Sequence, residues 1–436
     1  MKENKSTKPF YNAQIHGDWT TPEFGKVFSF LSTYSFSREQ LIDEKTVDEI
    51  QYIHYGDIHA KFENEILDFE SEKRIPYVKE GFISKDDSED EDFPLLKDGD
   101  LIIADASEDY EGVCNCVELK NINGRKVISG LHTFAARGNK EEIALGFRTY
   151  ALNNRQVVRE LWRIATGISV YSVSKTNLSK VKLPLPPLPE QKAIAHILSL
   201  MDTAINKNNS LIAKKELQKK WLMQNLLTGK KRLKGFGGEW KKYKISQLGQ
   251  IVTGNTPSMA KPEYYGDKYC WATAFDFKGV YIDKTDIKLS EEGKNVARIV
   301  PRGSILVTCI ASIGKNAIAN VEMAFNQQIN AIVPNENFHS EFIYYIIENS
   351  LHKLKEVAGA GAVSIINKSN FEAIKLEFPS IEEQTTIAQV LQAADKEIQL
   401  LKIKTEKLRE QKKGLMQVLL TGKKRLTVRA EDFQPQ

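Results

Sequence analysis

The heptapeptide LTGKKRL occurs twice in this chain of 436 residues, at 227–233 and again at 420–426. The two copies lie 193 positions apart (420 − 227 = 193), and the same offset aligns the residues that precede each copy, so that Asp202 meets Asp395. Self-similarity at a fixed offset is the signature of a duplicated architecture. The chain is therefore predicted to consist of two halves with the same layout.

A weaker correspondence links segments further upstream. Trp19 falls on Trp240 at an offset of 221, and Ser37 falls on Ser258 at the same offset. The residues between this correspondence and the repeat differ between the halves. Each half is therefore predicted to hold a block of its own sequence, followed by a segment that both halves share.

The shared segments are predicted to form two long helices. The first follows the proline-rich KLPLPPLP, where Pro189 suits a first turn, and the second follows Ser380, which has capping-box spacing to Glu383. Both helices should end at a glycine of the heptapeptide, Gly229 or Gly422, because glycine readily takes the left-handed conformation that closes a helix. The Lys-Lys-Arg beyond it would lie at the negative end of the helix dipole, where it could also contact a nucleic-acid or protein partner.

Apolar residues follow alternating spacings of three and four in both helices, which is the pattern of a coiled-coil seam. Most occupy matching positions at the offset of 193, so each helix is expected to pack on the other. The alternative is a surface helix that faces only its own block. Because the chain runs out along one helix and back along the other, we expect an antiparallel pair with an internal pseudo-twofold axis. The predicted seam residues are Ile194, Leu198, Met201, Ile205, Ile212, Leu222, Leu226, Ile387, Leu391, Ile398, Leu401, Leu408, Leu415 and Leu419.

Strand-like runs such as DLIIADA and GSILVTCI occur in the blocks together with helical runs such as FHSEFIYYIIENSLHKL, which makes each block α+β. The expected fold is two globular domains joined by two long antiparallel helices that form a coiled coil. The expected boundaries are 1–188 for the first domain, 189–235 for the first helical region, 236–380 for the second domain, and 381–436 for the second helical region with its tail.

The composition narrows the class of protein. Hydrophobic residues make up 41% and charged residues 27% of the chain, as in ordinary globular proteins. Since no stretch approaches the ~18 uninterrupted apolar residues of a membrane span, we expect a cytoplasmic protein without membrane contact. The four cysteines lack the spacing of a zinc site and are expected to be buried or partly buried free thiols. A net charge of +4 is compatible with nucleic-acid binding.

The two halves resemble the specificity subunits of type I restriction-modification systems. The helical regions of that family are similar to KLPLPPLPEQKAIAHILSLMDTAI and IKLEFPSIEEQTTIAQVLQAADKEI, each followed further on by LLTGKKRL. The family's two target-recognition domains are similar to SREQL and YIHYGDIHAKF in the first block, and to TGNTPS, EYYGD, GSILVTCIASIGKNAI and FNQQINAIVP in the second.

The resemblance implies a subunit that reads a bipartite target in double-stranded DNA and has no chemistry of its own. It further implies docking of two copies of an adenine methyltransferase subunit and, in the full complex, of ATP-dependent restriction subunits. S-adenosylmethionine, ATP and magnesium would then belong to the partner subunits, and this chain would hold neither a cofactor nor a metal.

The rival interpretation is a self-sufficient DNA-acting nuclease. Asp105, Glu118 and Lys120 have the spacing of a metal-dependent nuclease triad, but the apparent counterpart of VELK, which is VEMA at 321–324, lacks the lysine. The segment CIASIGKN resembles the end of a phosphate loop without its first glycine and its magnesium-binding hydroxyl, so a turn between strands is expected. The sequence contains no motif for extruding a target adenine and no glycine-rich methyl-donor fingerprint.

Base readout needs side chains that donate and accept hydrogen bonds on a rigid scaffold. Polar residues in turn-rich stretches of both blocks are candidates, although a capping or loop-closing role is about as frequent for such residues. The acidic run KDDSEDEDF at 85–93 would repel phosphate and is expected to face away from DNA. The candidates are Ser35, Ser37, Arg38, Ser107, His132, Thr133 and Arg137 in the first block, and Asn255, Thr256, Ser258, Lys261, Thr308, Ser312, Lys315, Asn326, Gln327 and Gln328 in the second.

Overall fold

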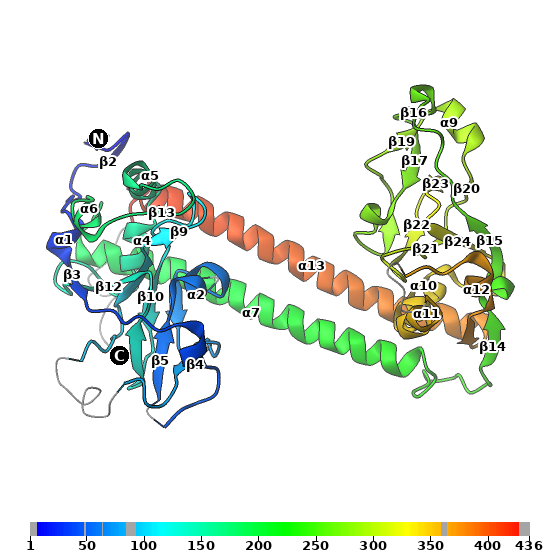
Figure 1. The fold of residues 1–436 in the computed structure, drawn as a ribbon, viewed down its shortest axis with the longest axis horizontal. Coiled ribbons are helices and arrows are strands. Elements are labelled where there is room, and N and C mark those ends of the chain that lie inside the picture. Colours follow the sequence, from blue (N-terminus) through cyan, green and yellow to red (C-terminus); the bar gives the residue numbers. More distant parts are fainter. Residues whose placement is uncertain (1–6, 48, 63, 84–92, 359–363, 427–436) are drawn as a thin grey trace. The chain divides into compact units, whose positions relative to one another are not determined.

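The chain divides into two compact units. The computed structural model describes residues 7–47, 49–62, 64–83, 93–358 and 364–426 (Figure 1). Unit 1 consists of Met1–Asn208 and Lys404–Gln436, and unit 2 consists of Asn209–Ile403. Both divisions fall inside long helices, α7 (Leu188–Leu226) and α13 (Ile381–Leu419). Each unit therefore combines one block with part of each helix.

Unit 1 contains two larger sheets. The first has the order β3 (Phe28–Leu31), β12 (Thr133–Gly138), β8 (Leu101–Ala104), β10 (Cys116–Lys120), β6 (Ile66–Asp68), and its neighbours are antiparallel except for the parallel pair β10 and β6. The second has the order β11 (Lys126–Ser129), β5 (Ile50–Ile53), β7 (Tyr77–Val78), β4 (Leu41–Ile42), with β11 and β5 parallel.

Shorter elements complete unit 1. The strands are the hairpin β1 (Thr7–Phe10) and β2 (Ala13–His16), and the pair β9 (Ala106–Ser107) and β13 (Tyr171–Ser172). The helices are α1 (Phe24–Val27), α2 (Tyr55–Ala60), α4 (Arg148–Leu152), α5 (Arg155–Ile164) and α6 (Lys175–Ser179), with a 3-10 turn at Arg38–Gln40.

Unit 2 repeats the first sheet strand for strand and the second sheet with one additional strand, β20. The first has the order β15 (Gly249–Thr253), β24 (Ile329–Pro334), β21 (Ile305–Thr308), β22 (Asn316–Ala319), β18 (Tyr281–Ile282), and the second has the order β16 (Tyr265–Gly266), β19 (Lys288–Leu289), β17 (Tyr269–Ala272), β23 (Met323–Phe325), β20 (Ile299–Val300). The remaining elements are β14 (Lys241–Lys244) paired with β25 (Lys375–Phe378), the helices α8 (Ile245–Leu248), α9 (Glu291–Val296), α10 (Ser340–Asn349), α11 (Leu351–Ala358) and α12 (Lys368–Ala373), and 3-10 turns at Pro262–Tyr264 and Ala274–Asp276.

The strand pairings establish which residues correspond. When β8 is laid on β21, the ladders place Leu31 on Val252, which reproduces the offset of 221 that the sequence predicted upstream. They also place Glu118 of β10 on Ile318 of β22. The choice of VEMA at 321–324 as the counterpart of VELK was therefore wrong. Residues 321–324 instead lead into β23, which belongs to the second sheet. The strand equivalent to β10 is β22, because β22 pairs with β21 as β10 pairs with β8.

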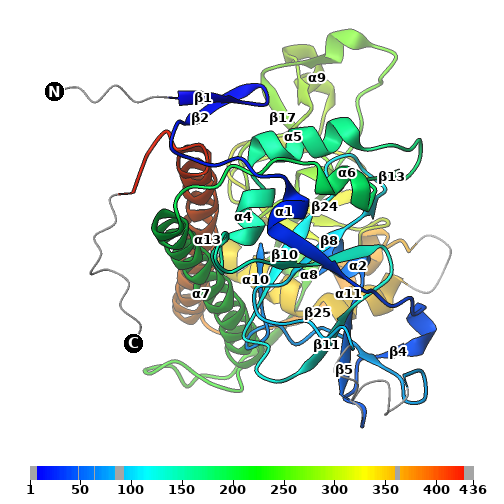
Figure 2. The ribbon, with the colours of Figure 1, turned by 90° about the vertical axis from the view of Figure 1, so that its left-hand side faces the viewer.

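The long helices lie side by side and antiparallel within each unit (Figures 1 and 2). In unit 1, Asp202 of α7 forms an ion pair at 2.6 Å with Lys412 of α13. In unit 2, Lys219 of α7 forms one at 2.7 Å with Asp395 of α13. The two ion pairs are equivalent, because Asp202 corresponds to Asp395 and Lys219 corresponds to Lys412 at the offset of 193. In each pair, the aspartate comes from one half of the sequence and the lysine from the other. All predicted seam side chains are buried or partly buried.

The heptapeptides close both helices as the sequence predicted. Gly229 and Gly422 have a φ of +67°, the left-handed conformation that closes a helix, and the amide two residues beyond each glycine donates to a carbonyl of the last helical turn. A Cβ on Gly422 would lie 3.2 Å from the ring of Trp19, and one on Gly229 would lie 3.5 Å from that of Trp240. The repeated tryptophans therefore cover the repeated glycines of the opposite half.

Arginines of the heptapeptides reach the beginning of the other helix. Arg425 forms an ion pair at 2.6 Å with Glu190 in unit 1, and Arg232 forms one at 2.5 Å with Glu383 in unit 2. Both carboxylates are almost fully buried, with 4% and 2% of the side chain exposed. Of the two hydrogen bonds predicted for the capping box of α13, one is formed, because the Ser380 hydroxyl accepts from the Glu383 amide at 3.4 Å. The Glu383 side chain binds Arg232 instead of the Ser380 amide.

We expect Arg425→Ala to lower the free energy of unfolding by about 3 kcal/mol, because it leaves the Glu190 carboxylate buried without its partner. Adding Glu190→Gln should recover much of this loss. Arg409→Ala is the matched control, since its partner Glu406 is exposed and such pairs contribute roughly 0–1 kcal/mol. Urea unfolding measures all three variants, and equal losses for Arg425→Ala and Arg409→Ala would contradict the role given to Glu190.

Candidate nucleic-acid interface

Polar residues of unit 2 gather at one edge of its first sheet. Because neighbouring strands are antiparallel, β15 and β21 end at the edge where β22 and β24 begin. Most of the candidates follow or precede these strand ends: Thr256 and Ser258 after β15, Thr308, Ser312 and Lys315 around the turn from β21 to β22, and Asn326, Gln327 and Gln328 before β24. The structure thus brings together stretches that are far apart in the sequence.

Several of these candidates hold the edge together. Thr308 is fully buried and donates a hydrogen bond to the carbonyl of Ser312. Asn326 accepts from the Gln328 amide at 3.1 Å, and Asn255 binds the backbone of Val296 and Arg298. These side chains shape the loops.

Other candidates of unit 2 face solvent. The exposed ones are Thr256, Ser258, Lys261, Lys315 and Gln327, and Ser312 and Gln328 are partly exposed. Thr256 donates to the Gln327 side chain, and the Lys261 ammonium lies over the Tyr264 ring. This exposed set has the donors and acceptors that contact with base edges or phosphates requires.

The corresponding edge of unit 1 holds six of its seven candidates. Three of them are exposed and follow β3, namely Ser35, Ser37 and Arg38. Two are buried, namely Ser107 and Thr133. The Thr133 hydroxyl forms hydrogen bonds with the Ser129 hydroxyl and the Gly130 carbonyl. His132 lies at the start of β12 with 52% of its side chain exposed.

Arg137 is not part of this group. It lies at the far end of β12, where it forms an ion pair at 2.6 Å with the buried Asp100 and donates to the carbonyl of Leu95. The guanidinium of Arg137 also donates hydrogen bonds to the carboxylate of Asp100, and these raise the pKa of Arg137.

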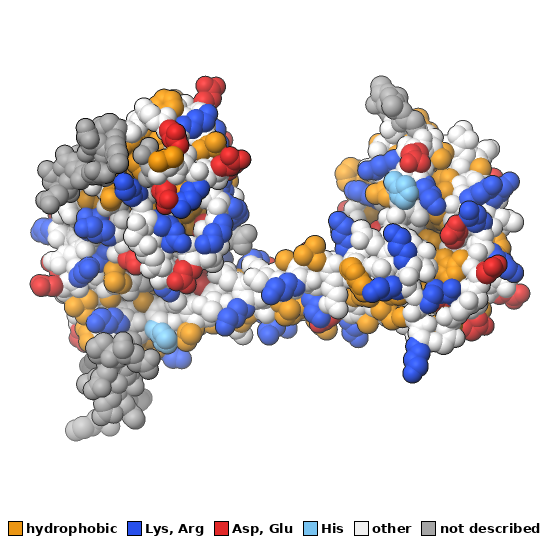
Figure 3. Space-filling model, turned by 90° about the horizontal axis from the view of Figure 1, so that it is seen from below, with side chains coloured by type: hydrophobic (Ala, Val, Ile, Leu, Met, Phe, Trp, Pro, Cys, Tyr) orange, Lys and Arg blue, Asp and Glu red, His pale blue; other side chains and the backbone are white. Residues whose placement is uncertain are grey.

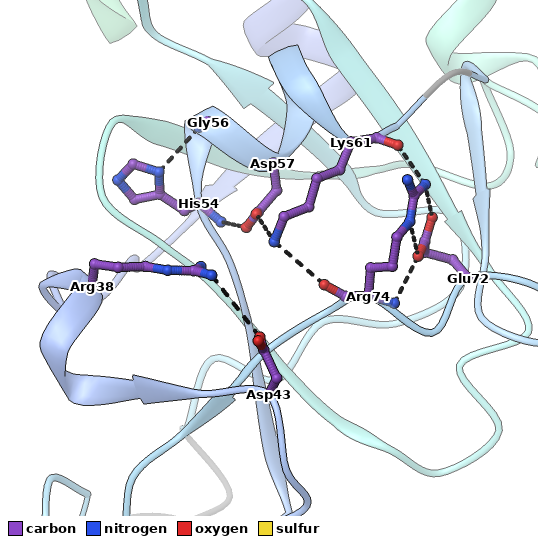
Figure 4. A network of polar contacts seen from close by, with 8 residues as sticks. All are labelled: Arg38, Asp43, His54, Gly56, Asp57, Lys61, Glu72 and Arg74. Atoms are coloured by element: carbon purple, nitrogen blue, oxygen red, sulfur yellow. Dashed lines mark hydrogen bonds and ion pairs between the residues drawn. The ribbon is translucent and has the colours of Figure 1, made fainter. Parts of the chain in front are cut away.

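A turn that holds none of the predicted candidates adjoins the unit 1 edge, inside the segment YIHYGDIHAKF. His54 caps α2 by accepting from the Gly56 amide at 3.0 Å, and its own amide donates to Asp57 at 2.9 Å (Figure 4). Asp57 also forms an ion pair at 2.6 Å with Lys61. Burial lowers the pKa of His54, which favours the neutral imidazole that this hydrogen bond requires.

Unit 2 contains the same cap, where Thr273 accepts from the Phe275 amide and its own amide donates to Asp276. A signal for this turn was present in the sequence, because the Asp lies three residues after the capping residue in both blocks. Figure 4 also shows Arg38 directed toward Asp43, 3.9 Å away at an exposed site.

The residues of the proposed nuclease triad do not form one site. Glu118 is buried, and both of its carboxylate oxygens accept backbone amides, those of Gly146 and Thr149. Burial raises the pKa of Glu118 to about 7. Glu118 lies opposite Leu101, so Asp105 is displaced by four positions along the ladder, or ~13 Å at ~3.3 Å per residue. Among the described residues, no group of three His, Cys, Asp or Glu side chains is placed to hold a metal ion.

The turn CIASIGKN and the four cysteines match the predictions from the sequence. CIASIGKN forms a turn between β21 and β22, as predicted, with Ala311 and Gly314 at positive φ. The four cysteines are buried and free, as predicted. Residues 85–92 of the acidic run lie outside the described residues. No helix in the described part of the chain is both long and apolar enough to cross a membrane.

Comparison with known proteins identifies relatives that cover up to 82% of this chain. A family model described as the type I restriction modification DNA specificity domain matches residues 17–216 and again residues 237–410. The MjaX specificity subunit of Methanocaldococcus jannaschii, which its name assigns to a type I restriction enzyme, is 28% identical over 378 residues, 82% of this chain and 85% of that protein. The HindI specificity subunit of Haemophilus influenzae is 36% identical over 149 residues, 33% of this chain and 32% of that protein.

Solved structures show the same fold at low sequence identity. The S subunit of a type I restriction-modification system from M. genitalium has a TM-score of 0.59 and 14% identity, covering 96% of this chain and 98% of that one. A chain from a study of complex assembly and conformational transition of the type I R-M system has a TM-score of 0.57 and 16% identity, covering 94% and 99%.

Proposed function

The chain belongs to the type I restriction-modification DNA specificity family, and from that premise we propose that each unit reads one half of a bipartite target in double-stranded DNA. One observation carries the proposal. The first sheet has the same topology in both units, and the same edge of that sheet presents polar side chains that differ between the units. Two equivalent scaffolds with different exposed residues suit a target with two different half-sites.

We propose that this chain contributes recognition and no chemistry. Thr308 and Thr133 are buried and hydrogen-bonded within the scaffold, and the Glu118 carboxylate is buried and accepts one backbone amide on each oxygen, so these groups do not face a substrate. S-adenosylmethionine, ATP and magnesium would then act in partner subunits, namely methyltransferase and restriction subunits. Such a complex would work in the cytoplasm.

We further propose that the long helices hold two identical methyltransferase subunits. The exposed surface of the helices is itself duplicated: Lys214, Gln218, Lys220 and Gln224 of α7 are exposed, and so are Lys407, Gln411, Lys413 and Gln417 of α13, each at the offset of 193. Figure 3 shows Lys and Arg side chains along the outside of the helices. A repeated surface can bind two copies of one partner in equivalent ways.

The docking proposal predicts a change in stoichiometry. Reversing both charges on α7, Lys214→Glu with Lys220→Glu, should remove one methyltransferase subunit from the purified complex, and reversing Lys407 and Lys413 as well should remove the second. Native mass spectrometry counts the subunits. Lys353→Glu with Lys355→Glu on α11 is the control for two charge reversals in unit 2. Complexes that keep two methyltransferase subunits in every variant would refute the proposal.

The absence of chemistry predicts that the purified chain alone does not cut DNA. Incubation with supercoiled plasmid and magnesium should leave the plasmid intact, and addition of the partner subunits with ATP and S-adenosylmethionine should restore site-dependent activity. Cleavage by the isolated chain, lost in a Glu118→Gln variant, would favour the nuclease interpretation instead.

The bipartite target predicts that the blocks can be exchanged independently. Replacing residues 236–378 with the equivalent block of a related protein should change one half of the methylated motif and leave the other half as it was. Sequencing the methylated bases of cells that express the complete system measures this result. A change in both halves would show that the blocks do not read separately.

A further inference from the structure

The turn at residues 130–132, between β11 and β12, is fixed by four hydrogen bonds at the edge of unit 1. The Gly130 amide donates to the Ile53 carbonyl at 2.8 Å, and the Leu131 amide donates to the Tyr52 hydroxyl at 2.7 Å. The Tyr55 amide donates to the Leu131 carbonyl at 3.4 Å, and the Asp105 amide donates to the His132 carbonyl at 3.2 Å. Two separate segments, residues 52–55 and Asp105, therefore hold the turn in one conformation.

His132 occupies the last position of this turn in an unusual conformation. Its φ is +54°, a left-handed value that few residues other than glycine adopt and that persists only where the surroundings enforce it. Its ring stands edge-on to that of Tyr55, with 5.4 Å between centroids and 82° between planes. Its Nδ1 lies 3.5 Å from a carboxylate oxygen of Asp105. The imidazole is thus oriented on one side and exposed to solvent on the other.

Unit 2 presents Gln328 at the equivalent position. The Gln328 carbonyl accepts from the Cys309 amide at 2.8 Å, as the His132 carbonyl accepts from Asp105. Both residues directly precede a central strand, β24 or β12. Glutamine pairs well with the N6 and N7 positions of adenine, whereas an imidazole makes a single contact with N7 or O6 of a purine or with an exocyclic amino group. The same scaffold position therefore carries different base-reading chemistry in the two units.

We propose that His132 reads a base edge in the half-site of unit 1, and that Gln328 does so at the corresponding place in the half-site of unit 2. This inference rests on the proposed function and assigns a residue to it. A side chain on a rigid backbone can discriminate between bases, because it loses little conformational entropy when it contacts one. Tyr55 and Asp105 contribute by fixing the orientation of the ring.

The test uses His132→Gly and His132→Asn in cells that express the complete system. Both replacements tolerate positive φ, so the turn should keep its conformation while the imidazole is lost. The methylated motif is then mapped by sequencing. One position in one half-site should become degenerate, with discrimination at that position reduced roughly ten-fold or more, as expected for one base contact. Gln328→Ala should do the same in the other half-site, and His352→Gln, an exposed histidine on α11, should change neither.

Two outcomes would overturn the inference. One is an unchanged motif with unchanged discrimination in both His132 variants, while the wild-type system methylates a bipartite motif. The other is degeneracy in both half-sites from either His132 variant alone. Failure of the proposed function would look different, because the wild-type system itself would then produce no bipartite motif.

Discussion

The structure depends on ion pairs between opposite halves of the sequence. The carboxylates of Glu190 and Glu383 are buried at the beginnings of the long helices, and each finds its arginine at the end of the other helix. A buried carboxylate without a partner is strongly destabilising. Neither half can therefore complete its own unit, and each unit is built from the block and helix start of one half with the helix end of the other. This exchange explains why the heptapeptide is repeated: its glycine ends the helix, and its arginine satisfies the carboxylate in the opposite half.

The same exchange recurs further along the helices. Asp202 accepts from the hydroxyl of Tyr150 at 2.8 Å and pairs with Lys412, and Asp395 accepts from Tyr345 at 2.7 Å and pairs with Lys219. Each trio links a block, the helix that follows it and the helix of the other half. Unit 1 adds Glu65 to the trio as a second partner of Lys412. Polar contacts of this kind fix the register of a helix pair more sharply than apolar packing, since a shift by one turn would separate every charge from its partner.

The sequence predicted the elements and their repetition better than it predicted contacts. The helices, their terminating glycines and the α+β blocks could be predicted, because each depends on a pattern within one continuous segment of sequence. The partner of Glu190 could not be found this way, because an offset of 193 aligns Glu190 with Glu383 and gives no indication that the arginines are exchanged. At the sheet edge, the structure brings most of the candidate stretches together, but the sequence did not indicate which of their side chains are buried. Thr133 and Thr308 turn inward to close loops, and Arg137 lies at the far end of its strand with Asp100. The backbone conformation of His132 leaves no trace in the sequence.

Residues at equivalent positions of the two units are alike where they hold the fold and differ where they face solvent at the sheet edge. Asp57 and Asp276 hold the same turn in both units by the same hydrogen bond to a capping residue, because a backbone amide is the same whatever sequence surrounds it. The capping residues differ, His54 in one unit and Thr273 in the other, since either can accept from an amide. Positions that face solvent at the edge differ in chemistry, as His132 and Gln328 do. A duplicated scaffold with divergent exposed positions can change its target without disturbing its fold, because the groups that contact the ligand are not the groups that hold the sheets and helices together.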